Sequence, residues 1–151
     1  MLKLFVTVGT TEFDNLIKHV DLNLGDSKDF LITAQISDHA CYKPQYIQSF
    51  NFIDNIDNEI ERADIVITHA GAGSVYSLLE RGKKIIVVPN ISRVDHHQLE
   101  LARYVERCNY GYSCFDFVNL EALINSIQQV EFSKYSKTDF FGIEAILELL
   151  K

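Results

Sequence analysis

Two short runs of isoleucine and valine, on either side of a glycine-rich turn, constrain the fold of this chain more than any other feature. The first run covers Ile65–Thr68, the second covers Lys84–Val88, and the turn between them carries Gly71 and Gly73. Both runs are too short for a buried helix, and such apolar runs are typical of parallel strands covered on both faces. The stretch therefore predicts a strand, a tight turn, a short helix and a second strand.

The turn also predicts a binding site for an anion. Gly71 and Gly73 lack a Cβ, so the backbone can bend tightly and approach a ligand closely. Ser74 is a candidate cap for the following helix, whose free N–H groups and dipole favour a phosphate. Many strand-to-helix turns carry glycine only to make the turn, and that interpretation stays open at this point.

Strands alternate with helices along the rest of the chain. Further strands are expected at Lys3–Val8, Phe30–Ile36 and Tyr112–Phe115, with a weaker one at Ile47–Ile53. Helices are expected from Asp14 to Gly25, at Ile56–Ala63, at Asp95–Cys108, after Asn119 and at Thr138–Leu150, with Asp14 and Asn119 as caps. This alternation predicts an α/β fold, with a Rossmann-like parallel sheet and helices on both faces. No linker divides the sequence, so residues 1–151 are expected to form one domain.

Composition argues against several classes of protein. With 47% hydrophobic and 23% charged residues, the chain is expected to form a packed core. A formal net charge of -7 argues against non-specific binding to nucleic acid. Cys41, Cys108 and Cys114 form no C-x-x-C pair, which favours reduced thiols over a metal site. No apolar run reaches the ~18 residues that span a bilayer, and no signal segment is evident, so a cytoplasmic protein is expected.

Three loops are expected to meet at one edge of the predicted sheet. Parallel strands end on the same side, and ligands of such sheets bind beyond the carboxyl ends of the strands. The loops in question are Gly9–Asp14, His69–Ser74 and Pro89–Gln98. In the first of them, Thr10 and Thr11 can hold a diphosphate or a donor sugar with their hydroxyl and backbone N–H groups.

Several side chains in these loops have two interpretations. Glu12 and Asp14 are candidate general bases if burial raises the pKa of either, but Asp14 is better explained as a helix cap and Glu12 equally well as a solvated charge. His69 is a candidate catalyst, although a lone histidine at a strand end is more often a hydrogen-bonded core residue. Gln98 can bond the hydroxyls of a sugar or be an ordinary exposed helix residue.

The sequence lacks three common signatures of cofactor and metal sites. No G-x-G-x-x-G follows the first strand, which disfavours an oxidoreductase, and no G-K-S or G-K-T forms a P-loop. His96 and His97 are adjacent, and neighbouring helix residues point about 100° apart, so the two are poorly placed to chelate one metal. A flavodoxin-like module that binds FMN is a weaker alternative.

Three segments in combination resemble the glycosyltransferase family 28 C-terminal domain. They are V-T-V-G-T-T-E-F-D, A-D-I-V-I-T-H-A-G-A-G-S, and K-K-I-I-V-V-P-N followed by D-H-H-Q-L-E-L-A, and the resemblance covers roughly residues 2 to 110. It is strongest to small stand-alone members: the catalytic subunit of a two-part enzyme that adds the second N-acetylglucosamine to a lipid-linked oligosaccharide, and bacterial capsule or exopolysaccharide transferase subunits. It implies the donor-binding half of a GT-B enzyme that transfers a sugar, of N-acetylglucosamine or galactose type, from UDP with inversion of the anomeric centre. It also implies that the reaction needs no cofactor and no obligatory metal.

The resemblance also implies roles for individual residues. Contacts to the nucleotide sugar are implied for Gly9, Thr10, Thr11, His69, Gly71, Ala72, Gly73, Ser74, Asn90, Asp95, His97 and Gln98. Family members commonly carry a ribose-binding glutamate three residues after the serine of the turn, and this chain has Ser77 there. His96 likewise stands in place of an asparagine, so the ribose contacts and the donor preference stay open.

A donor-binding half cannot place an acceptor, so we expect a separate partner subunit. In the families that the chain resembles, the partner is anchored in the membrane and helps to supply the site for a polyprenyl-linked sugar. The partner would bring the chain to the cytoplasmic face of the membrane and can carry the general base. The final expected helix is more consistent with core than with an interface, and a homo-oligomer is compatible with the sequence. The rival interpretation is a non-catalytic subunit that binds a nucleotide sugar or activates a partner.

Overall fold

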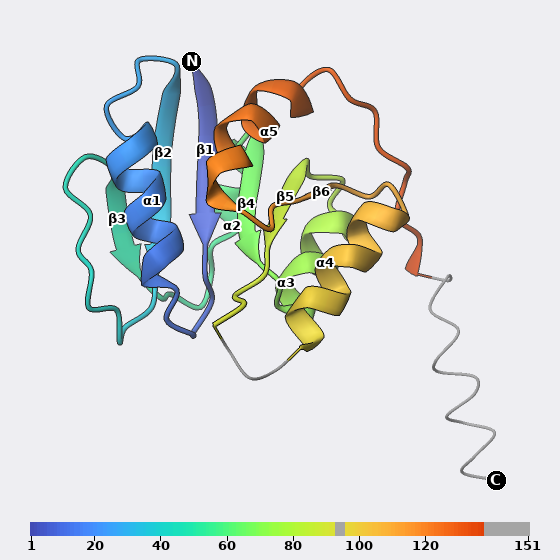
Figure 1. Ribbon diagram of the computed structural model, residues 1–151, viewed down its shortest axis with the longest axis horizontal. Helices are drawn as coiled ribbons and strands as arrows, with labels where there is room; N and C mark the ends of the chain where they lie inside the picture. The colour runs from blue at the N-terminus through green and yellow to red at the C-terminus, as the bar shows by residue number, and fades with distance from the viewer. Residues whose placement is uncertain (93–95, 138–151) are drawn as a thin grey trace, which may run out of the picture.

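Six parallel strands form one sheet, in the order β3-β2-β1-β4-β5-β6 (Figure 1). The computed structural model describes residues 1–92 and 96–137. The strands are β1 (Leu2–Thr7), β2 (Phe30–Ile36), β3 (Gln48–Asn51), β4 (Ile65–His69), β5 (Ile85–Val88) and β6 (Tyr112–Ser113). This order is that of doubly wound sheets that bind dinucleotides, and it confirms the predicted fold class.

Helices cover both faces of this sheet. They are α1 (Asp14–Leu24), α2 (Asp57–Arg62), α3 (Ala72–Glu80), α4 (His97–Arg107) and α5 (Leu120–Ile127), with a short 3-10 helix, η1 (Phe117–Asn119). Buried residues of α1 and α5 form one hydrophobic core with one face of the sheet. Buried residues of α2, α3 and α4 form a second core with the opposite face.

The Ile/Val run of β4 shows why the sequences of the central strands are continuously apolar. Successive side chains of a strand point to opposite faces of its sheet. Ile65 and Ile67 therefore pack into the core beside α1, whereas Val66 packs into the core beside α3. All three side chains are fully buried, since both faces of the sheet are covered.

The connection between β2 and β3, residues 37–47, contains no helix, and two carboxylates of α1 hold it in place. Asp14 Oδ2 accepts hydrogen bonds from the backbone N–H groups of Cys41 and Tyr42, at 2.9 and 3.0 Å. Asp21 is fully buried, and its carboxylate accepts four hydrogen bonds, from the Tyr42 hydroxyl and from the N–H groups of Gln45, Tyr46 and Ile47. Because the two acids are seven residues apart, about two helical turns, they lie on the same face of α1.

The predicted caps at Asp14 and Ser74 are wrong, because the N-cap residues of α1 and α3 are Phe13 and Gly71. Asn119 is the N-cap residue of α5, as predicted, but its side chain makes no cap hydrogen bond. Asp14 is the first residue of α1, and its carboxylate is used by the 37–47 connection. Ser74 lies inside the first turn of α3, because that helix begins two residues earlier, at Ala72. Asp116 supplies the cap near Asn119, for η1. The helix expected at 138–150 lies outside the described residues.

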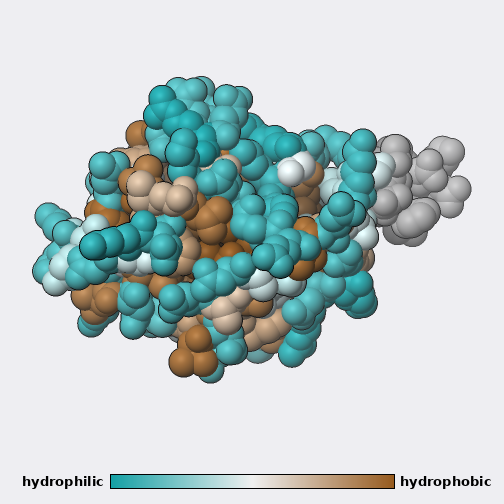
Figure 2. All heavy atoms as spheres, turned by 90° about the horizontal axis from the view of Figure 1, so that it is seen from above, coloured by the Kyte–Doolittle hydropathy of each residue, from teal (hydrophilic) through white to brown (hydrophobic). Residues whose placement is uncertain are grey.

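The amino ends of the strands form the end of the molecule opposite the predicted loops. Figure 2 shows this end, where hydrophilic residues dominate and hydrophobic residues are visible between them. Lys83 and Lys84 border a hollow of about 580 Å³ here. Their ammonium groups donate to main-chain carbonyls, of Glu61 and Ala63 for one lysine and of Ile127 and Gln128 for the other. Both lysines therefore stabilise helix ends.

Across residues 1–92 and 96–137, no helix combines the length and the apolar character that crossing a membrane requires.

Candidate functional site

The three predicted loops lie at the carboxyl edge of the sheet, which is the lower edge in Figure 1. β1 and β4 are paired neighbours, with Thr7 opposite Thr68, and β5 pairs with β4, with Val88 opposite His69. The helix after β1 packs on one face of the sheet, whereas the helix after β4 packs on the other. A crevice is expected where connections diverge in this way, and it is where open α/β sheets bind ligands.

The His69 imidazole lies at this boundary, between two glycines. A Cβ at Gly9 would stand 2.9 Å from His69 Cε1, and a Cβ at Gly71 would overlap His69 Nε2. Gly9 also has a φ of +65°, a conformation that side chains disfavour. Both glycines are therefore needed for the ring to pack against the backbone of the two loops.

The amino end of α3 is open. Gly71 is the N-cap residue, and its carbonyl accepts the first helical hydrogen bond, from Val75 N–H at 2.9 Å. The N–H groups of Ala72, Gly73 and Ser74 precede that bond and have no partner within the helix. A Cβ built on Gly73 would meet nothing within 4 Å. The helix end thus presents free donors and its positive dipole to open space.

Two cavities flank this helix end. The first, here called the His69 cavity, has a volume of about 340 Å³. It is lined by Thr11, His69, Ala70, Gly71, Ala72, His97, Gln98 and Leu101. Because His97 and Gln98 begin α4, the amino ends of two helices border this cavity. Both dipoles favour an anion there.

The second cavity, here called the Ser77 cavity, has a volume of about 420 Å³ and includes residues that the sequence prediction missed. Gly73, Ser74 and Ser77 line it from α3. Asp54, Asn55, Ile56, Asp57 and Arg81 also line it, and Arg81 forms an ion pair with Asp57 at 2.6 Å. Residues 54–57 follow β3, whose end lies at the same edge of the sheet as the predicted loops, and Arg81 follows α3.

Asn90 and Gln98 brace the loop after β5, and Asn90 also joins it to the loop after β1. Both are largely buried, at 8% and 9% exposure. Gln98 Oε1 accepts a hydrogen bond from Asn90 N–H at 2.9 Å, and Asn90 Nδ2 donates to the Glu12 carbonyl at 3.4 Å. Asn90 Oδ1 accepts from the backbone and the hydroxyl of Ser92. The alternative of an ordinary exposed residue is therefore wrong for Gln98, whereas sugar contacts by either amide stay predictions.

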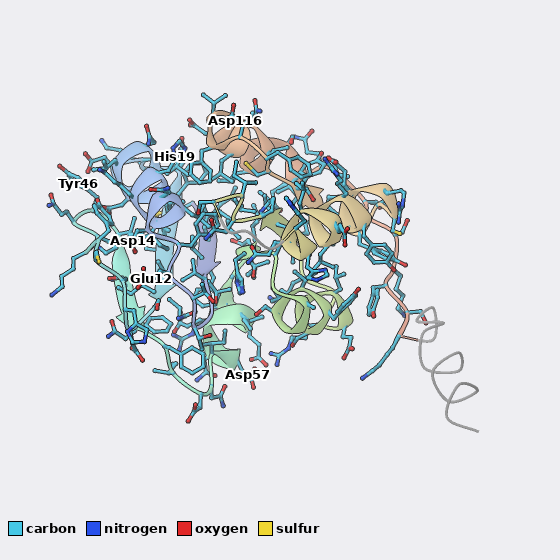
Figure 3. The ribbon with its side chains drawn as sticks, turned by 60° about the horizontal axis from the view of Figure 1, so that its bottom comes forward. Glu12, Asp14, His19, Tyr46, Asp57 and Asp116 are labelled. Atoms are coloured by element: carbon cyan, nitrogen blue, oxygen red, sulfur yellow. The ribbon has the colours of Figure 1, made fainter. Side chains whose placement is uncertain are left out.

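The three candidate catalytic side chains differ in their surroundings. Figure 3 turns the carboxyl edge towards the viewer and labels Glu12 and Asp14 beside the start of α1. Glu12 is exposed, and the carboxylate of Asp14 binds the 37–47 connection. His69 lines a cavity. Asp95 lies outside the described residues.

His97 of the predicted D-H-H-Q group is directed to the surface. Its Nδ1 lies 3.7 Å from Glu100 Oε2, one helical turn along α4, and the side chain is highly exposed. Within the described part of the chain, no three His, Cys, Asp or Glu side chains are grouped so that they could hold a metal ion.

The sequence also matches known proteins. The model of the glycosyltransferase family 28 C-terminal domain matches residues 3–146. A human protein named UDP-N-acetylglucosamine transferase subunit ALG13 is 34% identical over 121 residues, which are 73% of this chain and 11% of that protein. The chain thus spans about a tenth of the length of this relative.

Solved structures share the fold. A crystal structure of the glycotransferase of kitacinnamycin superposes with a TM-score of 0.68 at 18% identity, over 86% of this chain and 35% of that one. An NMR structure of ALG13 superposes with a TM-score of 0.59 at 20% identity, over 97% of this chain and 94% of that one. The sheet order, the open helix end at the β1–β4 boundary and the match over residues 3–146 lead to one conclusion. The chain belongs to the glycosyltransferase family 28 C-terminal domain family.

Proposed function

We propose that this chain binds a UDP-sugar and forms the donor-binding, catalytic subunit of an inverting glycosyltransferase. The observation that carries the proposal is the unobstructed amino end of α3 at Gly73, between two cavities. A diphosphate is the part of the donor that fits such a helix end, because free N–H groups and the dipole both favour negative charge. The names of the relatives, UDP-N-acetylglucosamine transferase subunits, support N-acetylglucosamine as the transferred sugar.

The nucleoside and the sugar of the donor would lie in different cavities. The Ser77 cavity would take the nucleoside, because Ser77 stands where family members commonly hold ribose and Asp54 offers a further acceptor. The His69 cavity would take the sugar, with Thr11 and Gln98 as hydrogen-bonding groups. The diphosphate would then lie between the cavities, against the N–H groups of residues 72–74.

Catalysis would rest on stabilising the leaving group. In an inverting transfer, an acceptor hydroxyl attacks the anomeric carbon as the bond to the UDP oxygen breaks, and a base removes the hydroxyl proton. The amino ends of α3 and α4 would offset the charge that grows on the diphosphate. Of the three candidate bases on this chain, His69 is supported best, because it lines the sugar cavity, whereas both acceptor bonds of Asp14 go to residues 41 and 42.

A partner subunit would complete the enzyme. The relatives are named as subunits of a transferase, which supports a partner. We propose that a membrane-anchored partner supplies the acceptor half and presents a polyprenyl-linked sugar at the cytoplasmic face of the membrane. The base can also belong to that partner.

One observation favours a second candidate function, a non-catalytic subunit that binds a nucleotide sugar. Ser77 lacks the carboxylate that family members commonly carry at this position. Its hydroxyl can still bond ribose, but more weakly than a charged acceptor. The neighbouring Asp57 is paired with Arg81, so that carboxylate is already in use.

Calorimetry with UDP, UMP and uridine tests the donor site. UDP is expected to bind about tenfold or more tightly than uridine, because the helix ends contact only the phosphates; tenfold corresponds to about 1.4 kcal/mol. A transfer assay then uses the chain co-expressed with its membrane partner, a UDP-sugar and a lipid-linked acceptor. Transfer together with UDP binding supports the enzyme, and UDP binding without transfer supports the non-catalytic subunit. Failure to bind UDP at millimolar concentration contradicts both.

A further inference from the structure

Gln35, near the end of β2, has every hydrogen-bonding position of its side-chain amide in use. The residue is buried, at 1% exposure. Its Oε1 accepts from the Thr7 hydroxyl at 2.7 Å and from Gly9 N–H at 3.2 Å. Its Nε2 donates to the carbonyls of Gly9 and Ile36, at 3.0 and 2.9 Å. A side-chain amide offers two donors and two acceptor positions, so these four bonds also fix its orientation.

This amide continues the β1–β2 pairing beyond the end of the strand. The ladder ends with Thr7 of β1 opposite Gln35. Two residues later, the N–H and the carbonyl of Gly9 both bond to the Gln35 side chain, as they would to a neighbouring strand. The next carbonyl, of Thr10, accepts from the Ser37 hydroxyl at 3.0 Å. The end of β2 therefore holds the backbone of the first site loop.

The same loop segment is packed against the site. Gly9 lies so close to His69 that a Cβ would stand 2.9 Å from the ring, and Thr11 lines the His69 cavity. A rotation of the Gly9 peptide would therefore move the backbone beside both groups. Gln35 itself lines neither of the two cavities. It can act on a ligand only through the backbone that it holds.

We infer that Gln35 is a positioning residue: by holding the Gly9 peptide, it directs the N–H groups of Thr10 and Thr11 towards the donor diphosphate. The inference rests on the proposed function, because it needs a diphosphate in the crevice. It extends that function by assigning phosphate recognition to a residue that has no contact with the ligand. A purely structural role would weaken every ligand alike, whereas a positioning role weakens only ligands that carry the diphosphate.

The test is calorimetry of Gln35→Glu with two probes, UDP and uridine, together with thermal unfolding. Glutamate keeps the size of the side chain, but its carboxylate cannot donate to the carbonyls of Gly9 and Ile36. We expect UDP affinity to fall by about tenfold or more, while uridine affinity changes less than about twofold. Ser113→Ala is the matched control, since it removes a buried 2.6 Å hydrogen bond to the Ala102 carbonyl. Ser113 lies in β6, the edge strand that is farthest from β2 in the sheet. Its ratio of UDP to uridine affinity is expected to equal that of the wild type.

A second variant keeps the test decisive if Gln35→Glu does not fold. Ser37→Ala removes the bond to the Thr10 carbonyl, together with one that the hydroxyl accepts from His39 N–H, and is expected to lower UDP affinity selectively, by a smaller factor. An unchanged ratio of UDP to uridine affinity in the folded variants overturns the role of Gln35 and leaves the proposed function intact. Absence of UDP binding by the wild type overturns the proposed function, and this inference with it.

Discussion

Valine in place of Gly73 is expected to abolish binding of a UDP-sugar while the chain stays folded. Gly73 lies in the first turn of α3, and a Cβ there meets nothing within 4 Å. The new side chain would occupy the space in front of the helix end, where we place the diphosphate. Displacing a phosphate by about 1 Å can cost a factor of 100 in rate, so transfer should fall at least about 100-fold.

Comparing alanine with valine at position 73 tests this prediction further, because UDP affinity and the free energy of unfolding should change in opposite directions. Alanine at position 73 is expected to raise the free energy of unfolding by about 0.5–1 kcal/mol, since glycine is a poor helix residue. Alanine should nevertheless weaken UDP binding, and valine should weaken it further. Gly71→Ala is the contrasting control. Its Cβ would overlap the His69 ring, so it should lower both binding and the free energy of unfolding, the latter by about 1–3 kcal/mol. Full UDP affinity in Gly73→Val contradicts the proposed phosphate position.

Alanine in place of Asp21 is expected to destabilise the fold by about 3 kcal/mol or more, because several buried donors lose their acceptor. The buried carboxylate accepts the Tyr42 hydroxyl and three backbone N–H groups of the 37–47 connection. Asp14→Ala should cost less, since Asp14 accepts two bonds. Asp26→Ala, at an exposed position after α1, should change the free energy of unfolding by less than about 0.5 kcal/mol. Urea unfolding measures the free energy of unfolding of all three variants. Equal losses from the substitutions at 21 and 26 contradict the role of Asp21 in holding the 37–47 connection.

The contribution of Asp21 should also depend on pH in one direction. Burial alone raises the pKa of Asp21, but the hydrogen bonds from Tyr42 and from three backbone N–H groups outweigh it, so the pKa lies below its ordinary value. A lowered pKa in the folded state stabilises the fold above the pKa of the unfolded carboxyl, about 3.9. The stability difference between wild type and Asp21→Asn should therefore be constant above about pH 5 and shrink as the pH falls below about 4. A difference that grows on acidification contradicts this account.

The sheet could be predicted because its signals are local. The apolar run of β2 is found at Phe30–Ile36, as predicted, and β4 ends at His69, one residue later than predicted. Alternation of strands and helices then requires parallel pairing, which places the loops after β1, β4 and β5 at one edge. The meeting of these loops follows from topology and needs no knowledge of individual contacts.

Side-chain partners could not be predicted, because they join distant parts of the chain. Asn90 donates to the Glu12 carbonyl, 78 residues away, and Gln35 binds Gly9, 26 residues away. The cap predictions failed at Asp14 for the same reason, since a tertiary partner took its carboxylate. The contribution of residues 54–57 to the Ser77 cavity was missed although a signal existed: β3 ends at the same edge of the sheet, so the residues after it belong with the other loops.

Titration of the isotopically labelled chain with UDP, followed by backbone amide shifts in two-dimensional NMR spectra, tests the central claim most directly. That claim is that strand-terminal loops hold a diphosphate on main-chain N–H groups. The account predicts that the largest shift changes fall on residues 9–11 and 71–74, with smaller ones at residues 54–57 and 97–98. Changes confined to the amino edge of the sheet, around Lys83 and Lys84, or no changes at millimolar UDP, would contradict it.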